Sequence, residues 1–94
     1  MITMDQYIQL ANKIIHEQEL VIGPLAFDQA RKVAGLQIDD KGKVSISGNG
    51  GSIVTNLVGK FKELFGDASV EVCKDAAREV NPQIPTEELP EILR

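Results

Sequence analysis

The sequence is poor in the residues that most often carry chemistry. It contains no tryptophan, one cysteine (Cys73) and one histidine (His16), and aromatic residues make up 4% of its 94 positions. A single cysteine excludes an internal disulfide, and the usual structural zinc sites take four cysteine or histidine ligands. We therefore expect neither a metal site nor a cofactor, and a core built mostly from aliphatic side chains.

Long hydrophobic runs are missing too. The longest nearly apolar run, Leu20 to Phe27, is interrupted by Gly23 and Pro24, whereas a membrane-spanning helix needs about 20 apolar residues. The first residues lack the basic flank and apolar core of a signal peptide, and a lone cysteine fits a reducing compartment. These features predict a cytoplasmic protein without a membrane partner.

Apolar spacing predicts two helices in the first part of the chain. Thr3 and Gln6 form a capping box, and the apolar residues that follow predict a helix from about Met4 to Glu19. Pro24 suits the first turn of a second, short helix. We expect Gly35 to end that helix in a left-handed conformation.

The second half of the chain predicts two more helices. The third helix follows a glycine-rich stretch and is expected to end at Gly66, after which Asp67 should cap the fourth with its carboxylate. Asn81-Pro82 should end the fourth helix. The apolar stripe of the third helix consists of Ile53, Val54, Leu57, Val58, Phe61, Leu64 and Phe65, and that of the fourth of Val70, Cys73, Ala77 and Val80.

A β-hairpin is predicted between the two pairs of helices. Leu36 and Ile38 alternate with polar residues, as do Val44 and Ile46, and Gly42 suits the left-handed position of a three-residue hairpin loop. The order is then α-α-β-β-α-α, a small single α+β domain with a central hairpin packed by helices. Because a lone hairpin has exposed edges, we slightly favour a homodimer that joins two hairpins into one sheet.

The last residues differ in composition from the rest. Residues 1–82 are expected to form one compact α+β domain, and residues 83–94 an acidic tail that contains Pro85 and Pro90. Terminal segments are commonly held loosely, and two prolines lie in the last ten residues, so we expect a loosely held tail.

The glycine-rich stretch is the first candidate for a binding site. It consists of Gly48, Asn49, Gly50, Gly51 and Ser52. The two specific phosphate-binding motifs are absent, because no Lys-Ser or Lys-Thr pair follows and Ile53 stands where a dinucleotide fold has its last glycine. What remains is a weak anion site at a helix N-terminus. We favour the plainer interpretation that glycines 50 and 51 provide unusual backbone angles and that Ser52 or Asn49 caps the helix.

Catalysis is disfavoured by the positions of the two reactive side chains. Cys73 falls on the apolar stripe of the fourth helix, where a buried thiol has a raised pKa and is inert. His16 falls opposite Tyr7 on the first helix and is expected to be exposed. A nucleophile and its base would have to meet, so we expect a protein that is not an enzyme.

A role in nucleic-acid binding is kept as an alternative, although the formal net charge of −4 opposes it because lysine and arginine must neutralise phosphates. A basic patch could form at the end of the second helix and the hairpin tip from Arg31, Lys32, Lys41 and Lys43. Acidic residues are interleaved with these four. The favoured function is a small protein-interaction or regulatory domain that self-associates, and the other alternative is a sensor of small ligands or anions at the glycine-rich stretch.

Overall fold

The first helix begins at the predicted capping box. In the computed structural model, which describes residues 2–94, helix α1 spans Met4–Ile22. The Thr3 hydroxyl accepts the Gln6 N–H at 3.1 Å, and the Gln6 side chain accepts the Thr3 N–H at 3.0 Å. The helix continues three residues past Glu19 because Gly23, with φ 72°, is the first residue to break it. This extension places three apolar residues, Leu20, Val21 and Ile22, in the last turn.

The second helix is shorter than expected. Helix α2 spans Leu25–Ala30 and is followed by turns up to Gly35. Gly35 has the expected positive φ of 85°, but it does not cap α2. Its carbonyl accepts the Ser47 N–H at 2.8 Å, so this residue already belongs to the hairpin.

The hairpin prediction is confirmed. Strand β1 (Leu36–Ile38) pairs antiparallel with β2 (Val44–Ile46), with Gln37 opposite Ser45. The Asp39 N–H donates to the Lys43 carbonyl at 3.0 Å, which leaves a three-residue loop that ends at Gly42. Gly42 has φ 81°, a conformation that side chains with a Cβ rarely adopt.

The last two helices are joined by one residue. Helix α3 spans Gly50–Phe65 and α4 spans Asp67–Ala77, with Gly66 as the C-cap of the first and the N-cap of the second. The prediction that Asp67 caps α4 is therefore wrong. Asp67 is the first helical residue, and its carboxylate lies 4.0 Å from the Lys62 ammonium instead.

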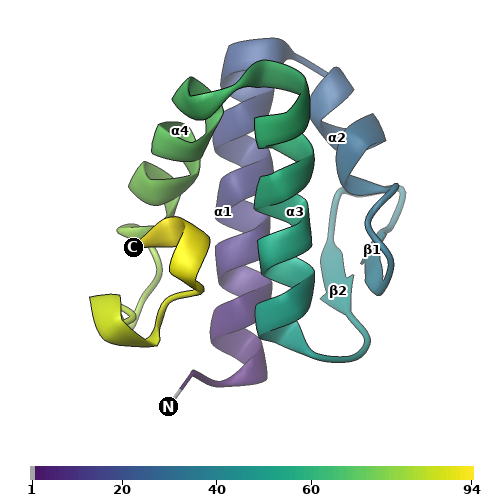
Figure 1. Ribbon diagram of the computed structural model, residues 1–94. Coiled ribbons are helices and arrows are strands. Elements are labelled where there is room, and N and C mark those ends of the chain that lie inside the picture. The colour runs from purple at the N-terminus through teal and green to yellow at the C-terminus, as the bar shows by residue number, and fades with distance from the viewer. Residues whose placement is uncertain (1) are drawn as a thin grey trace.

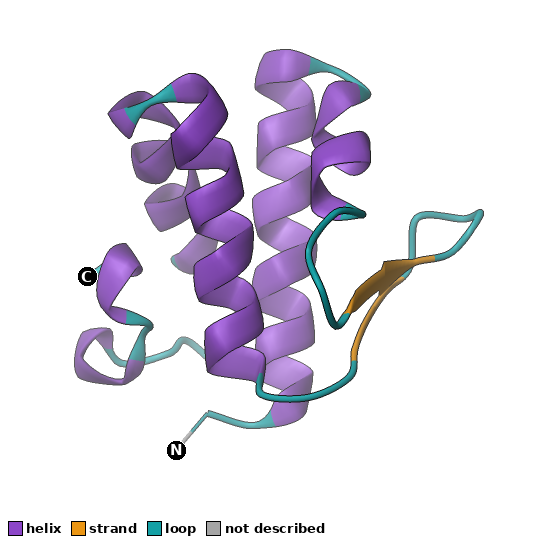
Figure 2. Cartoon of the chain, turned by 45° about the vertical axis from the view of Figure 1, so that its right-hand side comes forward, coloured by secondary structure: helices purple, strands orange, loops and turns teal. Residues whose placement is uncertain are grey.

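The four helices form the body of the molecule, and the hairpin is peripheral rather than central (Figure 1). Helices α1 and α3 run side by side in the same direction, and α2 and α4 run back against them. Strand β2 packs mainly against α1, and the tip of the hairpin projects away from the helices (Figure 2). The order α-α-β-β-α-α is confirmed as a small α+β arrangement. The centre is aliphatic around one phenylalanine, and its largest fully buried residues are Phe61, Leu10, Ile14, Ile15, Leu57, Gln18, Val54, Val58 and Cys73.

The C-terminal residues pack on this body, contrary to the loosely held tail expected from the prolines. Two single-turn 3-10 helices, η1 (Thr86–Glu88) and η2 (Glu91–Leu93), follow α4. The side chains of Ile84, Leu89 and Leu93 are buried in the same core as the helices. The expectation failed because it weighed prolines and charge, whereas apolar residues between them face the bundle and gain free energy on burial.

Hydrogen bonds from α1 fix the start of the tail. The side-chain amide of Gln9 donates to the Asn81 carbonyl at 3.0 Å and accepts the Asn81 N–H at 3.3 Å. The amide of Gln6 donates to the Pro82 carbonyl at 3.1 Å. These bonds satisfy backbone groups just beyond α4. They also hold this part of the chain against the N-terminal end of α1.

Candidate functional site

The glycine-rich stretch forms the start of α3. Asn49 is the N-cap, and its side chain accepts the Ser52 N–H at 2.9 Å. Of the glycines, Gly48 has a positive φ of 117°, whereas Gly50 and Gly51 do not. Gly50 is instead packed against a ring, because a Cβ there would lie 2.6 Å from the Cγ atom of Tyr7. The expectation that Gly50 and Gly51 provide unusual backbone angles is therefore wrong.

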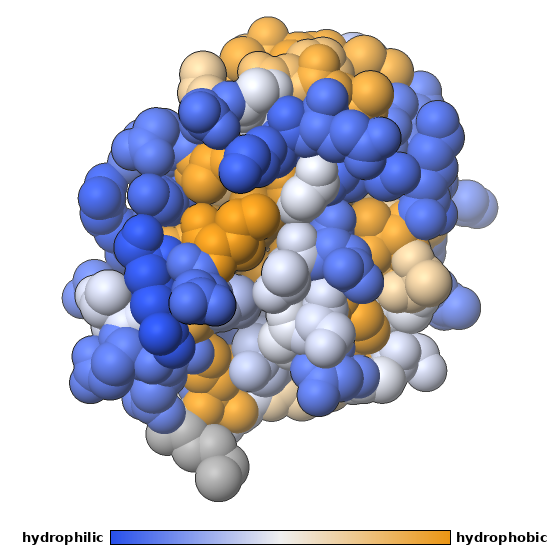
Figure 3. All heavy atoms as spheres, in the orientation of Figure 1, coloured by the Kyte–Doolittle hydropathy of each residue, from blue (hydrophilic) through white to orange (hydrophobic). Residues whose placement is uncertain are grey.

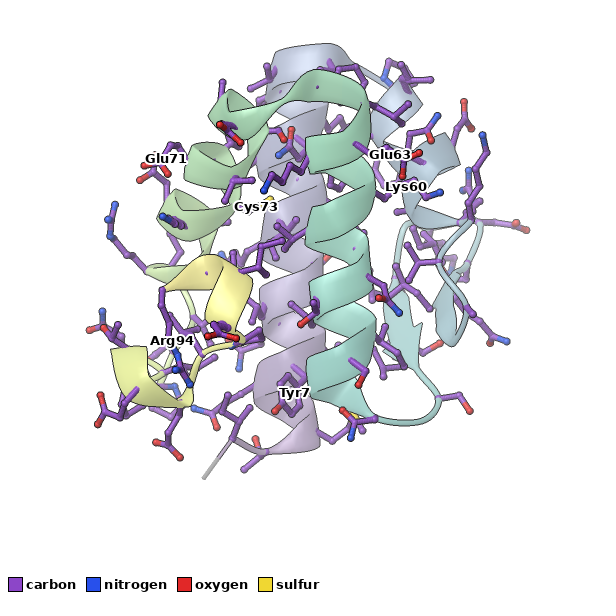
Figure 4. All side chains as sticks on the ribbon, in the orientation of Figure 1. Tyr7, Lys60, Glu63, Glu71, Cys73 and Arg94 are labelled. Atoms are coloured by element: carbon purple, nitrogen blue, oxygen red, sulfur yellow. The ribbon has the colours of Figure 1, made fainter. Side chains whose placement is uncertain are left out.

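Part of this stretch lines a cavity of about 380 Å³. The cavity lies between the first turns of α3, the Tyr7 ring and the tail, and Figure 4 shows Tyr7 beside the start of α3. Its lining residues are Tyr7, Asn49, Gly51, Ser52, Thr55, Asn56, Glu88 and Pro90. Amide and hydroxyl groups in this lining suit a small polar ligand.

Three of the four basic residues of the alternative patch line neighbouring cavities at the hairpin, and the fourth lines another cavity. Arg31 lines a cavity along β1 with Lys43, and another at the hairpin loop with Lys41. Lys32 lines a separate cavity, beside Lys60. Carboxylates of Asp39 and Asp40 line the cavities at the hairpin, and Asp28 pairs with Arg31 at 3.8 Å. The local charge is therefore mixed, which is a poor match for a phosphate backbone.

The reactive side chains occupy different environments. Cys73 is fully buried between α4 and α1 (Figure 4), where the Gln18 amide donates to its Sγ at 3.4 Å and to the Ser69 carbonyl at 2.9 Å. Burial raises the pKa of the Cys73 thiol to about 11, although the hydrogen bond from Gln18 offsets part of that shift. His16 is exposed on α1 and lies 3.7 Å from Glu19. Residues 2–94 contain no cluster of three or more acidic, cysteine or histidine side chains placed to hold a metal ion.

The clearest unexplained feature is an apolar surface where α1 and α3 end. Figure 3 shows a broad hydrophobic area over this end of the molecule. Five large apolar side chains with exposed fractions from 36% to 80% belong to the helix ends that meet there. We call this surface the end cap, and it consists of Leu20, Val21, Leu25, Leu64 and Phe65.

Sequence reasoning missed the end cap although its signals were visible. Leu20 and Val21 lie in the apolar run that was noted only as too short for a membrane. Leu64 and Phe65 were assigned to the buried stripe of the third helix, but their turn extends past the helices that cover the rest of that stripe, and residues 62–68 are all exposed. Periodicity identifies the face of a helix, not how far along the helix its neighbours reach.

Acidic side chains surround the end cap. The segments that form this end, residues 16–28 and 60–71, contain six acidic residues and two lysines. Glu63 and Glu71 lie on opposite flanks of the bundle near this end, and Lys60 lies beside Glu63 (Figure 4). Arg31 and Lys74, just outside these segments, lie 3.8 Å from Asp28 and 3.3 Å from Glu71. With them included, acidic side chains at this end exceed basic ones by two.

Comparison of the chain with protein-family models, with curated proteins and with solved structures finds no match. Within residues 2–94, the helices are all too short or too polar to cross a membrane.

Proposed function

We propose that this chain is a small non-enzymatic protein-interaction domain that docks a partner through the end cap. The observation that carries the proposal is the gathering of five large apolar side chains, exposed by 36% to 80%, at one end of the bundle. Single exposed apolar residues are ordinary, whereas a contiguous apolar patch with a polar rim marks an interaction surface.

The structure supports the end cap over the hairpin edge as the docking surface. Strand β1 has three residues, and Arg31 and Lys43 lie along it. Short strands with charged neighbours discourage edge-to-edge pairing. The homodimer favoured from the sequence stays a prediction, with the end cap as a second surface through which two copies could meet.

Photo-crosslinking in the cells that produce the protein tests the proposal. A photoreactive phenylalanine analogue placed at Phe65 should form a discrete covalent adduct, and the yield should fall when Leu20→Asp is added. Met4 provides the matched control position, because it is 43% exposed but lies at the opposite end of α1. Equal adducts at positions 65 and 4, or none at 65, would reject docking through the end cap.

A second candidate function is the binding of a small polar ligand in the cavity beside Tyr7. It is supported by the convergence of Asn49, Gly51 and Ser52, three of the five residues singled out in the sequence, on one cavity of about 380 Å³. Titration with uncharged and cationic metabolites should shift the amide resonances of Gly51 and Ser52. Unchanged resonances at millimolar concentrations would exclude it.

A further inference from the structure

We propose that the end cap binds a cationic amphipathic helix of a partner protein, rather than a second copy of this chain. The inference rests on the proposed function and adds the chemistry of the partner. Two properties of this end carry it: the extent of the apolar surface and the charge of its rim.

The apolar surface has the size of the centre of an interface. Leu20 and Val21 are exposed by 80% and 65%, and with the other three side chains they form a patch on the order of several hundred Å². A standard interface buries roughly 800 Å² on each partner, with an apolar centre and a polar rim. An amphipathic helix of four turns is about 22 Å long, which fits across a molecule of 31 × 27 × 20 Å. Such a helix presents apolar residues at i, i+3, i+4 and i+7 to a surface of this kind.

The rim calls for positive charge on the partner. Residues 16–28 contain three acidic side chains and no lysine or arginine, and residues 60–71 contain three acidic side chains and two lysines. Three of these carboxylates lie near a basic side chain: Asp67 is 4.0 Å from Lys62, Asp28 is 3.8 Å from Arg31 and Glu71 is 3.3 Å from Lys74. With Arg31 and Lys74 included, six acidic and four basic side chains leave an excess of two negative charges at this end. Lysine or arginine residues that flank the apolar face of the partner would meet this excess.

The same charges oppose a second copy at this surface. A two-fold contact brings the same patch of both subunits together, which would place the two acidic rims side by side. Like charges across an interface cost free energy. Self-association through the end cap is therefore expected to increase with salt, while binding of a cationic helix is expected to decrease with salt.

A labelled peptide tests the inference. The probe is an amphipathic peptide of about 18 residues made of leucine and lysine, and its binding to the full chain is followed by fluorescence anisotropy. Two control peptides have the same length: a leucine–glutamate peptide with the same pattern, and a leucine–lysine peptide with a scrambled pattern. We expect the patterned lysine peptide to bind several-fold more tightly than either control, with affinity that falls as salt rises from about 50 to about 500 mM.

Matched variants locate the contact. Leu20→Gln and Glu63→Lys should each weaken binding of the patterned lysine peptide by roughly fivefold or more. Met4→Gln makes a similar apolar-to-polar change at the other end of α1, and Glu79→Lys makes the same charge change beyond α4. Both control variants should leave the affinity within about twofold of the unmodified chain.

Sedimentation of the chain alone distinguishes failure of this inference from failure of the proposed function. If the peptide does not bind, but the chain dimerises at high salt and Leu20→Gln abolishes the dimer, the end cap docks a second copy; the inference then fails and the proposed function stands. If the peptide does not bind and the chain stays monomeric, the peptide-binding inference is rejected, and the crosslinking result at Phe65 decides the proposed function. Equal binding of the patterned and scrambled lysine peptides, or equal loss in Leu20→Gln and Met4→Gln, would show charge attraction without a docking surface and would overturn the inference.

Discussion

The two ends of the helical bundle are closed in different ways. On the half of the bundle where α1 begins, which we call the covered end, the tail packs along the flank of the helices (Figure 1). Leu89 and Leu93 are buried there, and Gln6 and Gln9 hold the backbone of residues 81 and 82. Where α1 ends, residues 62–68 are all exposed, and so are Leu20 and Val21. Apolar residues of the covered end are buried on folding, whereas those of the end cap stay exposed.

The course of the chain explains this difference. Helices α1 and α3 run toward the end cap, and α2 and α4 run away from it (Figure 1). The stretch before α3 and the tail therefore lie at the covered end. The connections at the end cap are Gly23-Pro24 and the single residue Gly66. Links of one or two residues are too short to cover the helix ends they join, so side chains in the last turns of α1 and α3 remain exposed.

The largest expected effect breaks the covered end. Leu93→Ala should lower the free energy of unfolding by about 2–4 kcal/mol, because the side chain is buried against α3 and α4 and its removal leaves a cavity. Urea denaturation followed by circular dichroism measures the change. Ile92→Ala, a partly buried neighbour in the same turn, serves as the control and should cost less. A loss below about 0.5 kcal/mol for Leu93→Ala would show that the tail does not close this end.

The second prediction tests whether water is excluded from the interior around Cys73. Burial raises the pKa of the Cys73 thiol from an unperturbed 9.0 to about 11. Proton release then favours the unfolded chain as pH rises from 9 to 11, so the free energy of unfolding should fall by roughly 2–3 kcal/mol in that window. Cys73→Ala removes this contribution, and the difference between the two pH profiles isolates it from the lysines. Parallel profiles would mean that water reaches the thiol.

The third effect compares two glycines of α3, one at the covered end and one along the helix. Gly50→Ala should cost about 1–3 kcal/mol, because the added Cβ meets the Tyr7 ring beside its Cγ atom. Gly59→Ala should gain up to about 1 kcal/mol, because nothing lies within 4 Å of its Cβ and alanine favours a helix. Thermal denaturation of both variants gives the signs. Stabilisation by both substitutions would mean that Tyr7 does not pack closely on the loop.

Local features of the fold could be predicted from the sequence, whereas the helix surfaces that distant segments bury could not. The capping box at Thr3, the hairpin loop with Gly42 and the break at Gly66 depend on neighbouring residues, so pattern alone locates them. Burial of Leu93 and exposure of Phe65 depend on how far other segments extend in space. Both residues look alike in the sequence, since each is apolar and near the end of a helical turn. The glycine-rich stretch shows the same limit: its cap was foreseen, but its contact with Tyr7 joins residues more than forty positions apart.

The smallest effect on stability is expected at the end cap, and it sharpens the contrast with Leu93. Leu20→Gln should change the free energy of unfolding by less than about 0.5 kcal/mol, because the side chain is 80% exposed and gains little from folding. Met4→Gln, at the other end of α1, should be equally mild. The same Leu20→Gln protein should bind less of a hydrophobic dye than the unmodified chain, whereas Met4→Gln should not. A cost of 2 kcal/mol or more for Leu20→Gln would place this leucine in the core. Leu20 and Leu93 would then both contribute to folding, and the contrast between an exposed end and a covered end would not hold.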